Sequence, residues 1–423
     1  MKDKGISLMK ERWILHADID HCYAQIHEML YPDLRKVPMA VGGHEEMRHG
    51  IILAKNDLAK QYGIKTAESL REAYEKLPSL LIIHPLYPLY ITYTEKVKDI
   101  YREYTDRVES FGLDEAWADL TPSLTLFGAS ATDLAKHIQN RVYKEMGLTV
   151  SLGLSFNKVF AKLGSDQRKP HGFYRMTKQD YPETVWPLPV EDLLFVGRAT
   201  KEKLRYYGIT TIGQLARRER SYLKKLFGKN GETLWFFANG MDVTEVASGP
   251  RREVIKSVGN GITTPADINT FDEAREVFLV LCESVATRLR ENGLAGQVVS
   301  VMLRGSDLAY IGRQRKLSRP TDLATEILEM VMILTRENWR QESPLRSIGV
   351  TISSLKPALS YRQSDLFTDE RAREKEVRLE QVIDRIRSKY GYDAIKRLGL
   401  LECPHLTNFN PLAEHVIHPE SWY

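Results

Sequence analysis

The sequence predicts a multidomain protein of the α+β class, and three observations lead to that prediction. The chain has 423 residues, more than one hydrophobic core usually organises, so we expect two to four domains. Residues 12–175 mix short apolar strands with amphipathic helices, which is typical of α/β and α+β domains. Residues 253–355 follow the order strand, helix, strand, strand, helix, strand, which is that of a ferredoxin-like fold.

The composition narrows the class of protein. Hydrophobic residues make up 43% and charged residues 27%, as in ordinary soluble proteins. No apolar run is long enough to span a bilayer and residues 1–4 do not begin a signal peptide, so we expect a cytoplasmic protein without a membrane partner. Three widely spaced cysteines predict neither a disulfide framework nor a zinc site. The net charge of +4 permits an anionic partner without requiring one.

Hydrophobic periodicity predicts the elements of the first part of the chain in order. Apolar runs indicate strands, helical spacing indicates helices, and Gly63 and Pro78 each end a helix. The expected strands are 12–19, 37–41, 51–54, 80–83 and 148–154, with a hairpin over 111–120. The expected helices run to residue 30 and over 55–62, 66–77, 88–109, 131–146 and 157–165.

Two acidic stretches stand inside apolar, strand-like runs. Asp18 ends the first strand, and Asp114 and Glu115 lie near the turn of the hairpin. Buried carboxylates are costly unless they are paired or hold a metal, and oxygen ligands suit two Mg²⁺ ions in phosphoryl transfer. An Asp at a strand end is more often a turn former or a helix cap, and that alternative stays open. Adjacent strand residues face opposite ways, so Asp114 and Glu115 share one site only if the hairpin distorts there.

A third stretch, residues 153–172, places the end of a strand before a basic helix. Lys158, Lys162 and Lys169 follow one another closely in this stretch, beside Arg168. Lysines at the rim of a carboxylate cluster neutralise a triphosphate. An ordinary basic helix face is an equal alternative for this stretch taken alone.

Together the three stretches resemble the motifs of the Y-family translesion DNA polymerases. Residues 18–24, 112–119 and 153–172 resemble the first, second and third motifs of that family, in the same order and spacing. The variant looks nearer to the UmuC-like and Gram-positive phage or plasmid (UvrX-type) branch than to the DinB branch. The resemblance implies a right-handed polymerase with a palm (1–26 and 80–175), fingers (27–79), a helix-hairpin-helix thumb (176–240), a linker (241–252), a ferredoxin-like little finger (253–356) and a C-terminal tail (357–423).

The resemblance also implies an activity. We expect template-directed DNA synthesis from dNTPs on primer-template DNA, in the form of error-prone synthesis past lesions in DNA repair and the SOS response. Asp18 and Asp114 would bridge two Mg²⁺ ions, and the Ile19 carbonyl would add a ligand. Glu115 would hold the ion that activates the primer 3′-OH.

Three residues are expected to hold the nucleotide. In the resembling family an aromatic residue at the position of Tyr23 stacks on the deoxyribose and excludes a 2′-OH. Lys60 and Lys169 would hold the β- and γ-phosphates. Asp57 stands where much of the family has a tyrosine, and an aspartate cannot attract phosphate.

Basic residues in two later segments are expected to contact DNA. Arg198 lies in a helix-hairpin-helix whose backbone N–H groups can bind phosphates. The family usually shows Gly-x-Gly here, and this chain has Ala199 in place of the second glycine, with Arg198 offering charge. Arg313, Arg315 and Arg319 share odd parity, so an unbroken strand would put them on one face. An ordinary charged sheet edge is the alternative for these three residues.

A short motif in the tail predicts a sliding clamp as partner. Residues 363–367 resemble the bacterial clamp-binding pentapeptide, with Gln363 followed, after two variable residues, by Leu366 and Phe367. The two apolar side chains could fill a pocket on the clamp, and the alternative is a local core contact.

Two functions other than DNA synthesis are alternatives for this sequence. A catalytically silent DNA-binding adaptor with a polymerase fold would keep the basic surfaces and lose the acids, whereas Asp18, Asp114 and Glu115 are present. A nuclease or cyclase with a two-metal palm is disfavoured by the thumb and little-finger patterns. Primer extension with Mg²⁺ and dNTPs separates the three.

Overall fold

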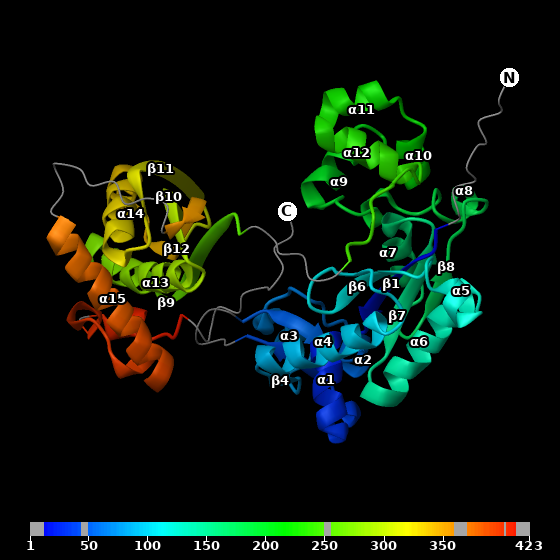
Figure 1. Cartoon of the computed structure of the whole chain (residues 1–423), viewed down its shortest axis with the longest axis horizontal. Coiled ribbons are helices and arrows are strands. Elements are labelled where there is room, and N and C mark those ends of the chain that lie inside the picture. Colours follow the sequence, from blue (N-terminus) through cyan, green and yellow to red (C-terminus); the bar gives the residue numbers. More distant parts are fainter. Residues whose placement is uncertain (1–11, 44–49, 249–254, 359–369, 402, 412–423) are drawn as a thin grey trace. The chain divides into compact units, whose positions relative to one another are not determined.

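The chain separates into two compact units in the computed structural model (Figure 1). The structure describes residues 12–43, 50–248, 255–358, 370–401 and 403–411, so the predicted clamp motif at Gln363, Leu366 and Phe367 lies outside the described residues. The first unit holds residues 12–42 and 51–248 of the described chain, and the second unit holds the described residues from 255 to 411. Among the described helices, none is both long and apolar enough to cross a membrane.

The first unit is a mixed α+β body. Its strands are β1 (Ile14–Ile19), β2 (Met39–Gly42), β3 (Ile52–Lys55), β4 (Leu81–Ile83), β5 (Val108–Ser110), β6 (Glu115–Asp119), β7 (Val150–Ser155) and β8 (Phe173–Arg175). Its helices are α1 (Cys22–Leu30), α2 (Asp57–Gln61), α3 (Leu70–Lys76), α4 (Tyr87–Arg102), α5 (Leu124–Phe127), α6 (Ala131–Met146), α7 (Lys158–Gln167), α8 (Tyr181–Thr184), α9 (Arg198–Tyr206), α10 (Ile212–Ala216), α11 (Arg220–Phe227) and α12 (Lys229–Ala238).

A five-stranded sheet with the order β5-β6-β1-β7-β8 forms the centre of this unit. The central strand β1 is antiparallel to both β6 and β7. Its odd-numbered side chains enter a core with α4 and α6, as Leu15 does. Its even-numbered side chains, among them His16 and Asp18, face the opposite side, where α7 packs on β1 and β7.

Helix α7 lies directly on the backbone of β7. A Cβ atom on Gly153 would lie 1.9 Å from the Ala161 carbonyl oxygen, and one on Gly164 would lie 3.1 Å from Gly153 Cα. Only glycine permits so close an approach, because any side chain would collide with main-chain atoms. The Asn157 side chain caps the helix by accepting a hydrogen bond from the Phe160 N–H over 2.8 Å.

A smaller sheet with the order β3-β2-β4 forms the region expected to be the fingers. Strand β4 pairs in parallel with β2, so this sheet reaches residue 83 and not 79. The expected helix 88–109 is too long, because α4 ends at Arg102 and residues 108–110 form β5 against β6.

Helices α9 to α12 gather into a separate bundle within the first unit (Figure 1). After α12 the chain returns to the central sheet. Val246 is buried against Ile14 and Trp117, and the Ala247 N–H donates to Glu109 Oε2 over 2.9 Å. The described part of the expected linker therefore packs against the first unit up to residue 248.

The second unit has the expected βαββαβ order. Its elements are β9 (Ser257–Ile268), α13 (Phe271–Glu291), β10 (Leu294–Gly305), β11 (Tyr310–Thr321), α14 (Ala324–Asn338) and β12 (Leu345–Pro357). The sheet has the order β11-β10-β12-β9, and Val299, Val301 and Val350 pack with α13 and α14 on one face.

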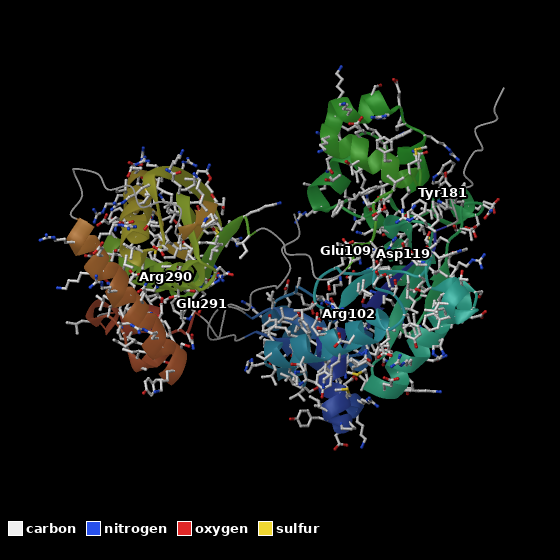
Figure 2. All side chains as sticks on the ribbon, viewed as in Figure 1. Arg102, Glu109, Asp119, Tyr181, Arg290 and Glu291 are labelled. Atoms are coloured by element: carbon white, nitrogen blue, oxygen red, sulfur yellow. The ribbon has the colours of Figure 1, made fainter. Side chains whose placement is uncertain are left out.

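The C-terminal segment 370–411, which the sequence analysis assigns to a tail, packs on this unit. It comprises α15 (Glu370–Tyr390), two short 3-10 turns and α16 (Pro404–Thr407). Tyr392, Leu406 and Phe409 join the core around α13. Arg290 of α13 binds Glu380 Oε2 over 2.5 Å and Asp384 Oδ2 over 2.6 Å, so ion pairs hold α15 against α13 (Figure 2).

Candidate active site

A pocket of about 450 Å³ opens where the central sheet meets the smaller sheet. The structure brings together here every residue predicted to hold metal or nucleotide, although they come from stretches far apart in sequence. The predicted residues that line the pocket are Asp18, Ile19, Tyr23, Lys60, Asp114, Glu115 and Lys169. The Ile19 side chain lies in the core, so Ile19 lines the pocket through its backbone.

The turn of the β5–β6 hairpin is distorted as the shared site requires. Strand β6 begins only at Glu115, which lies opposite Asp18 in the sheet. Asp114 lies in the bend before the strand, and its carbonyl oxygen accepts the Ile19 N–H over 3.1 Å. Both acids therefore reach one pocket in spite of being neighbours in sequence.

The acids strongly affect one another. Burial, followed by the negative charge of Glu115, raises the pKa of Asp18 to about 7. Burial and Glu115 also raise the pKa of Asp114. Burial acts to raise the pKa of Glu115 as well, but its contact with His16 and the charge of Lys162 outweigh burial and lower that pKa to about 2. The cluster thus carries more negative charge than its surroundings neutralise.

Two lysines of the third stretch neutralise part of this charge. Lys169 Nζ lies 2.6 Å from Asp18 Oδ2 and 2.9 Å from Asp166 Oδ1. Burial opposes the charge on Lys169, yet the negative charges of Asp18 and Asp166 raise its pKa. Lys162 Nζ donates to Glu115 Oε2 over 2.5 Å. Lys158 binds Glu109, outside the pocket lining.

The sequence analysis did not identify His16, whose buried imidazole contacts the Glu115 carboxylate. The imidazole is fully buried, its Nε2 lies 3.1 Å from Glu115 Oε2, and its Nδ1 lies 2.9 Å from Ser165 Oγ. Burial lowers the pKa of His16, which favours the neutral ring. The alternation of β1 placed His16 on the face of Asp18, but its partner Ser165 is 149 residues away.

The opposite wall of the pocket is basic, and sequence reasoning missed one of its lysines. Lys55, at the end of β3, lines the pocket with Lys60 and Asp57. Burial and then the positive charge of Lys60 lower the pKa of Lys55. The pocket lining therefore combines lysines of the smaller-sheet region with the carboxylates of the central sheet. A metal-bound polyphosphate would satisfy both sets of charges at once.

Tyr23 of α1 is held by other aromatic rings. It stacks on Tyr90 with ring centroids 4.2 Å apart and an angle of 9°, and Tyr87 meets it edge-on at 5.9 Å. Tyr90 is fully buried and its hydroxyl lies 2.8 Å from His27 Nε2. The Tyr23 ring therefore has a fixed position in the pocket wall.

The oxygen donors of the pocket fit Mg²⁺. Asp18, Asp114, Glu115 and the Ile19 backbone offer only oxygen, as hard cations prefer. Over the described residues, no group of three or more acidic, histidine or cysteine side chains is arranged to hold a metal ion. Asp18 and Glu115 each face an ammonium group.

The basic residues predicted to contact DNA are not part of the pocket lining. Arg198 is 91% exposed and pairs with Glu202. Arg313 and Arg315 lie opposite Val301 and Val299, so they share the helix-covered face of the sheet. The expected unbroken strand is irregular beyond Lys316. Arg315 pairs with Glu337 and Arg319 with Glu326, both on α14.

Family models match three parts of the chain. Residues 17–166 match the impB/mucB/samB family, and residues 255–366 match the C-terminal domain of that family. Residues 191–242 match the thumb domain of DNA polymerase iota. The first match contains the acidic pocket residues, and the other two contain the α9–α12 bundle and the ferredoxin-like sheet.

Similar proteins align with nearly the whole chain. The DNA polymerase IV of Acetivibrio thermocellus is 41% identical over 392 residues, which cover 93% of this chain and 98% of the relative. The DNA polymerase IV 2 of Bacillus subtilis is 37% identical over 401 residues, with 93% and 96% covered. A solved Y-family DNA polymerase chimera of Dbh and Dpo4 shares the fold with a TM-score of 0.70 at 20% identity, covering 81% of this chain and 98% of that chain.

Proposed function

Because the chain belongs to the Y family of DNA polymerases and is a DNA-directed DNA polymerase, we propose that it extends primers by two-metal nucleotidyl transfer. The family-model matches and the similar solved structure confirm the family and the fold class that the three motifs predict. The relatives carry the name DNA polymerase IV, and nearness to the phage and plasmid branch stays a prediction. Primer-template DNA is its partner.

The proposal rests on one observation above all. Asp18, Asp114 and Glu115 line one pocket, and the two aspartates have raised pKa values because burial and the charge of Glu115 disfavour their ionised forms. Asp18, Asp114 and the Ile19 carbonyl would hold two Mg²⁺ ions, and Glu115 would hold the one that activates the primer 3′-OH. The ions would lower the pKa of that hydroxyl and would neutralise the charge that develops on the α-phosphate.

Residues around the acids would orient the dNTP. Lys60 comes from α2 and Lys169 from the loop after α7, and both line the pocket, which suits a triphosphate held by the two lysines. Lys55 adds charge on the wall where Asp57 replaces the aromatic residue of the family. Tyr23, fixed by Tyr90, would lie under the sugar and exclude a ribose 2′-OH.

We assign the synthesis to translesion repair within the SOS response, with the sliding clamp as a further partner. Leu366 and Phe367 would anchor the polymerase in an apolar pocket of the clamp, with Gln363 at its rim, and the tether would raise the local concentration of enzyme at the primer end. Leu366→Ala with Phe367→Ala is expected to abolish stimulation by the clamp and to leave extension without clamp unchanged. A loss of extension without clamp contradicts this assignment.

Primer extension tests the main proposal. Purified protein with Mg²⁺, dNTPs and a primed template is expected to add nucleotides dictated by the template. Asp114→Asn is the matched control, since it keeps the side-chain shape and removes one ligand charge. Tight DNA binding without extension by the unaltered protein would favour the silent adaptor, and degradation of the primer would favour a nuclease.

A further inference from the structure

Asp20 is a carboxylate of the first acidic stretch that the chemistry above does not use. It follows β1 directly, where the chain turns into α1, and only 3% of it is exposed. Ser151 Oγ donates to Asp20 Oδ1 over 2.6 Å, and the backbone N–H of His171 donates to Oδ2 over 2.8 Å. Although Asp20 lines the pocket, both of its carboxylate oxygens are engaged by protein donors.

The bond to His171 ties Asp20 to the loop that carries Lys169. This loop, residues 168–172, turns tightly, since a Cβ on Gly172 would lie 1.6 Å from the Arg168 carbonyl oxygen. His171 has a φ of 52°, in the left-handed region that is unfavourable for a non-glycine residue. A turn of this kind needs contacts from outside the loop, and the Asp20 carboxylate supplies one at its centre.

We propose that Asp20 is a positioning residue for Lys169. By accepting the His171 N–H, Asp20 fixes the loop so that the Lys169 ammonium stays beside Asp18, at the rim of the acidic cluster. The inference rests on the proposed role of Lys169 in holding the triphosphate. A lysine already held at its binding position loses less conformational entropy when the dNTP arrives, so loosening the loop weakens nucleotide binding.

A role as a metal ligand is the competing assignment for Asp20, and the structure argues against it. The donors from Ser151 and His171 come from β7 and from the lysine loop, so they hold the two carboxylate oxygens toward protein groups. The Asp18 carboxylate, in contrast, accepts a hydrogen bond from the Lys169 ammonium, which an incoming cation can displace. The two aspartates of one stretch therefore have different tasks.

The test is a double-mutant cycle between Asp20 and Lys169. Asp20→Asn keeps the size of the side chain, but its amide can accept only one of the two hydrogen bonds. We expect the KM for dNTP and the dNTP Kd, measured with a dideoxy-terminated primer, to rise about tenfold, while kcat stays within about twofold. In a Lys169→Ala background, Asp20→Asn is expected to add nothing, because the loop then has no ammonium to position.

Two further variants make the test decisive. Ser151→Ala removes one donor to Asp20 and is expected to raise the KM for dNTP about threefold, an effect that also vanishes with Lys169→Ala. If Asp20→Asn fails to fold by circular dichroism, the Ser151 cycle decides. Asp106→Asn, at an exposed position of the same unit, is the control and is expected to change nothing.

The possible outcomes distinguish the positioning role of Asp20 from the triphosphate-binding role of Lys169. Additive effects of Asp20→Asn and Lys169→Ala, or a fall in kcat with a higher Mg²⁺ requirement, overturn the positioning role and make Asp20 a ligand. If Lys169→Ala itself leaves the dNTP Kd unchanged, the proposed triphosphate role of Lys169 fails instead.

Discussion

The acidic pocket of the first unit and the ion-pair cluster of the second unit both bury charged side chains, but they neutralise them differently. In the second unit, the Arg290 guanidinium binds Glu380 and Asp384, and the Ala324 N–H also donates to Glu380 over 3.0 Å. Burial still acts to raise the pKa of Glu380, against the charge of Arg290. Nearby, Arg373 and Arg319 both pair with Glu326, whose pKa is lowered in spite of its burial.

In the pocket, the counter-charges are lysines and not arginines. Lys162 and Lys169 each meet a carboxylate through a single ammonium, and the third acid, Asp114, has a raised pKa. A guanidinium binds a carboxylate through a rigid fork, whereas an ammonium is a point charge on a flexible stem. The second unit therefore uses buried charge to hold α15 in place, whereas the pocket keeps an excess of negative charge that a cation can neutralise.

The largest effect is expected when a pocket acid loses its charge. Asp18→Asn keeps the shape of the side chain but removes a ligand for both proposed ions, so primer extension should fall by about 10³-fold or more. Binding to primer-template DNA should stay near normal in a gel-shift titration. An extension rate within tenfold of the unaltered protein would contradict the two-metal assignment.

A charge removed from the second unit should affect stability and not chemistry. Arg290→Leu leaves Glu380 and Asp384 without their main partner, which should lower the free energy of unfolding by about 3 kcal/mol. Urea denaturation followed by circular dichroism measures this change. Arg385→Leu, at an exposed position of α15, is the control, with an expected change below about 0.5 kcal/mol. Equal effects from the two variants would mean that Arg290 does not hold α15 in place.

The same Asp18→Asn change should stabilise the protein without Mg²⁺, and the gain should depend on pH. The folded protein holds the Asp18 proton up to a pKa of about 7, while the ordinary aspartate pKa is 3.8. Ionising Asp18 therefore costs stability as pH rises from 4 through 7, and the asparagine variant avoids that cost. We expect the variant to be more stable by about 1–2 kcal/mol at pH 8 and by almost nothing at pH 4. Thermal unfolding at the two pH values, with EDTA present, measures the difference, and a variant less stable at pH 8 would show that Asp18 is well neutralised.

Exposed charges should give the smallest effects, and they test where DNA lies on the second unit. Arg304 and Lys316 share the sheet face opposite the helices, whereas Arg313 and Arg315 share the helix-covered face. Each lost phosphate contact lowers the slope of log K against log salt by about 0.9. Since Arg315 and Arg319 already pair with α14, we expect the triple alanine variant of Arg313, Arg315 and Arg319 to lose about one contact and the Arg304 and Lys316 double variant about two.

The opposite order of the two slopes would restore Arg313, Arg315 and Arg319 as the main DNA contact. Fluorescence anisotropy with one duplex over a series of salt concentrations gives both slopes. Unchanged slopes in both variants would place the DNA on neither face.

Motifs and periodicity made much of this structure predictable. Helices α6 and α13 begin and end where the apolar spacing places them, because their boundaries carry capping residues such as Ser130 and Thr270. The pocket acids were found because charged residues inside apolar strands are conspicuous. The expected strand, helix, strand, strand, helix, strand order of the second unit is also observed.

What could not be predicted depends on contacts between distant parts of the chain. His16 meets Ser165 only because β1 and β7 pair and α7 lies on β7. The buried charges of α15 look like those of a solvated helix until α13 supplies Arg290. In the same way, Arg313 and Arg315 were placed correctly on one face, but parity alone does not tell which face the helices cover.

The glycine contact between β7 and α7 matters for anyone who wishes to re-engineer the nucleotide pocket. Because main chain meets main chain at Gly153 and Gly164, the height of α7 above the sheet is set by backbone and by no side chain between them. Random libraries at Asp57 and Lys60 can therefore explore new nucleotide analogues while Lys162 keeps its distance from Glu115. A library that includes Gly153 would shift the whole helix, and most of its members would lose the pocket before they gained a new substrate.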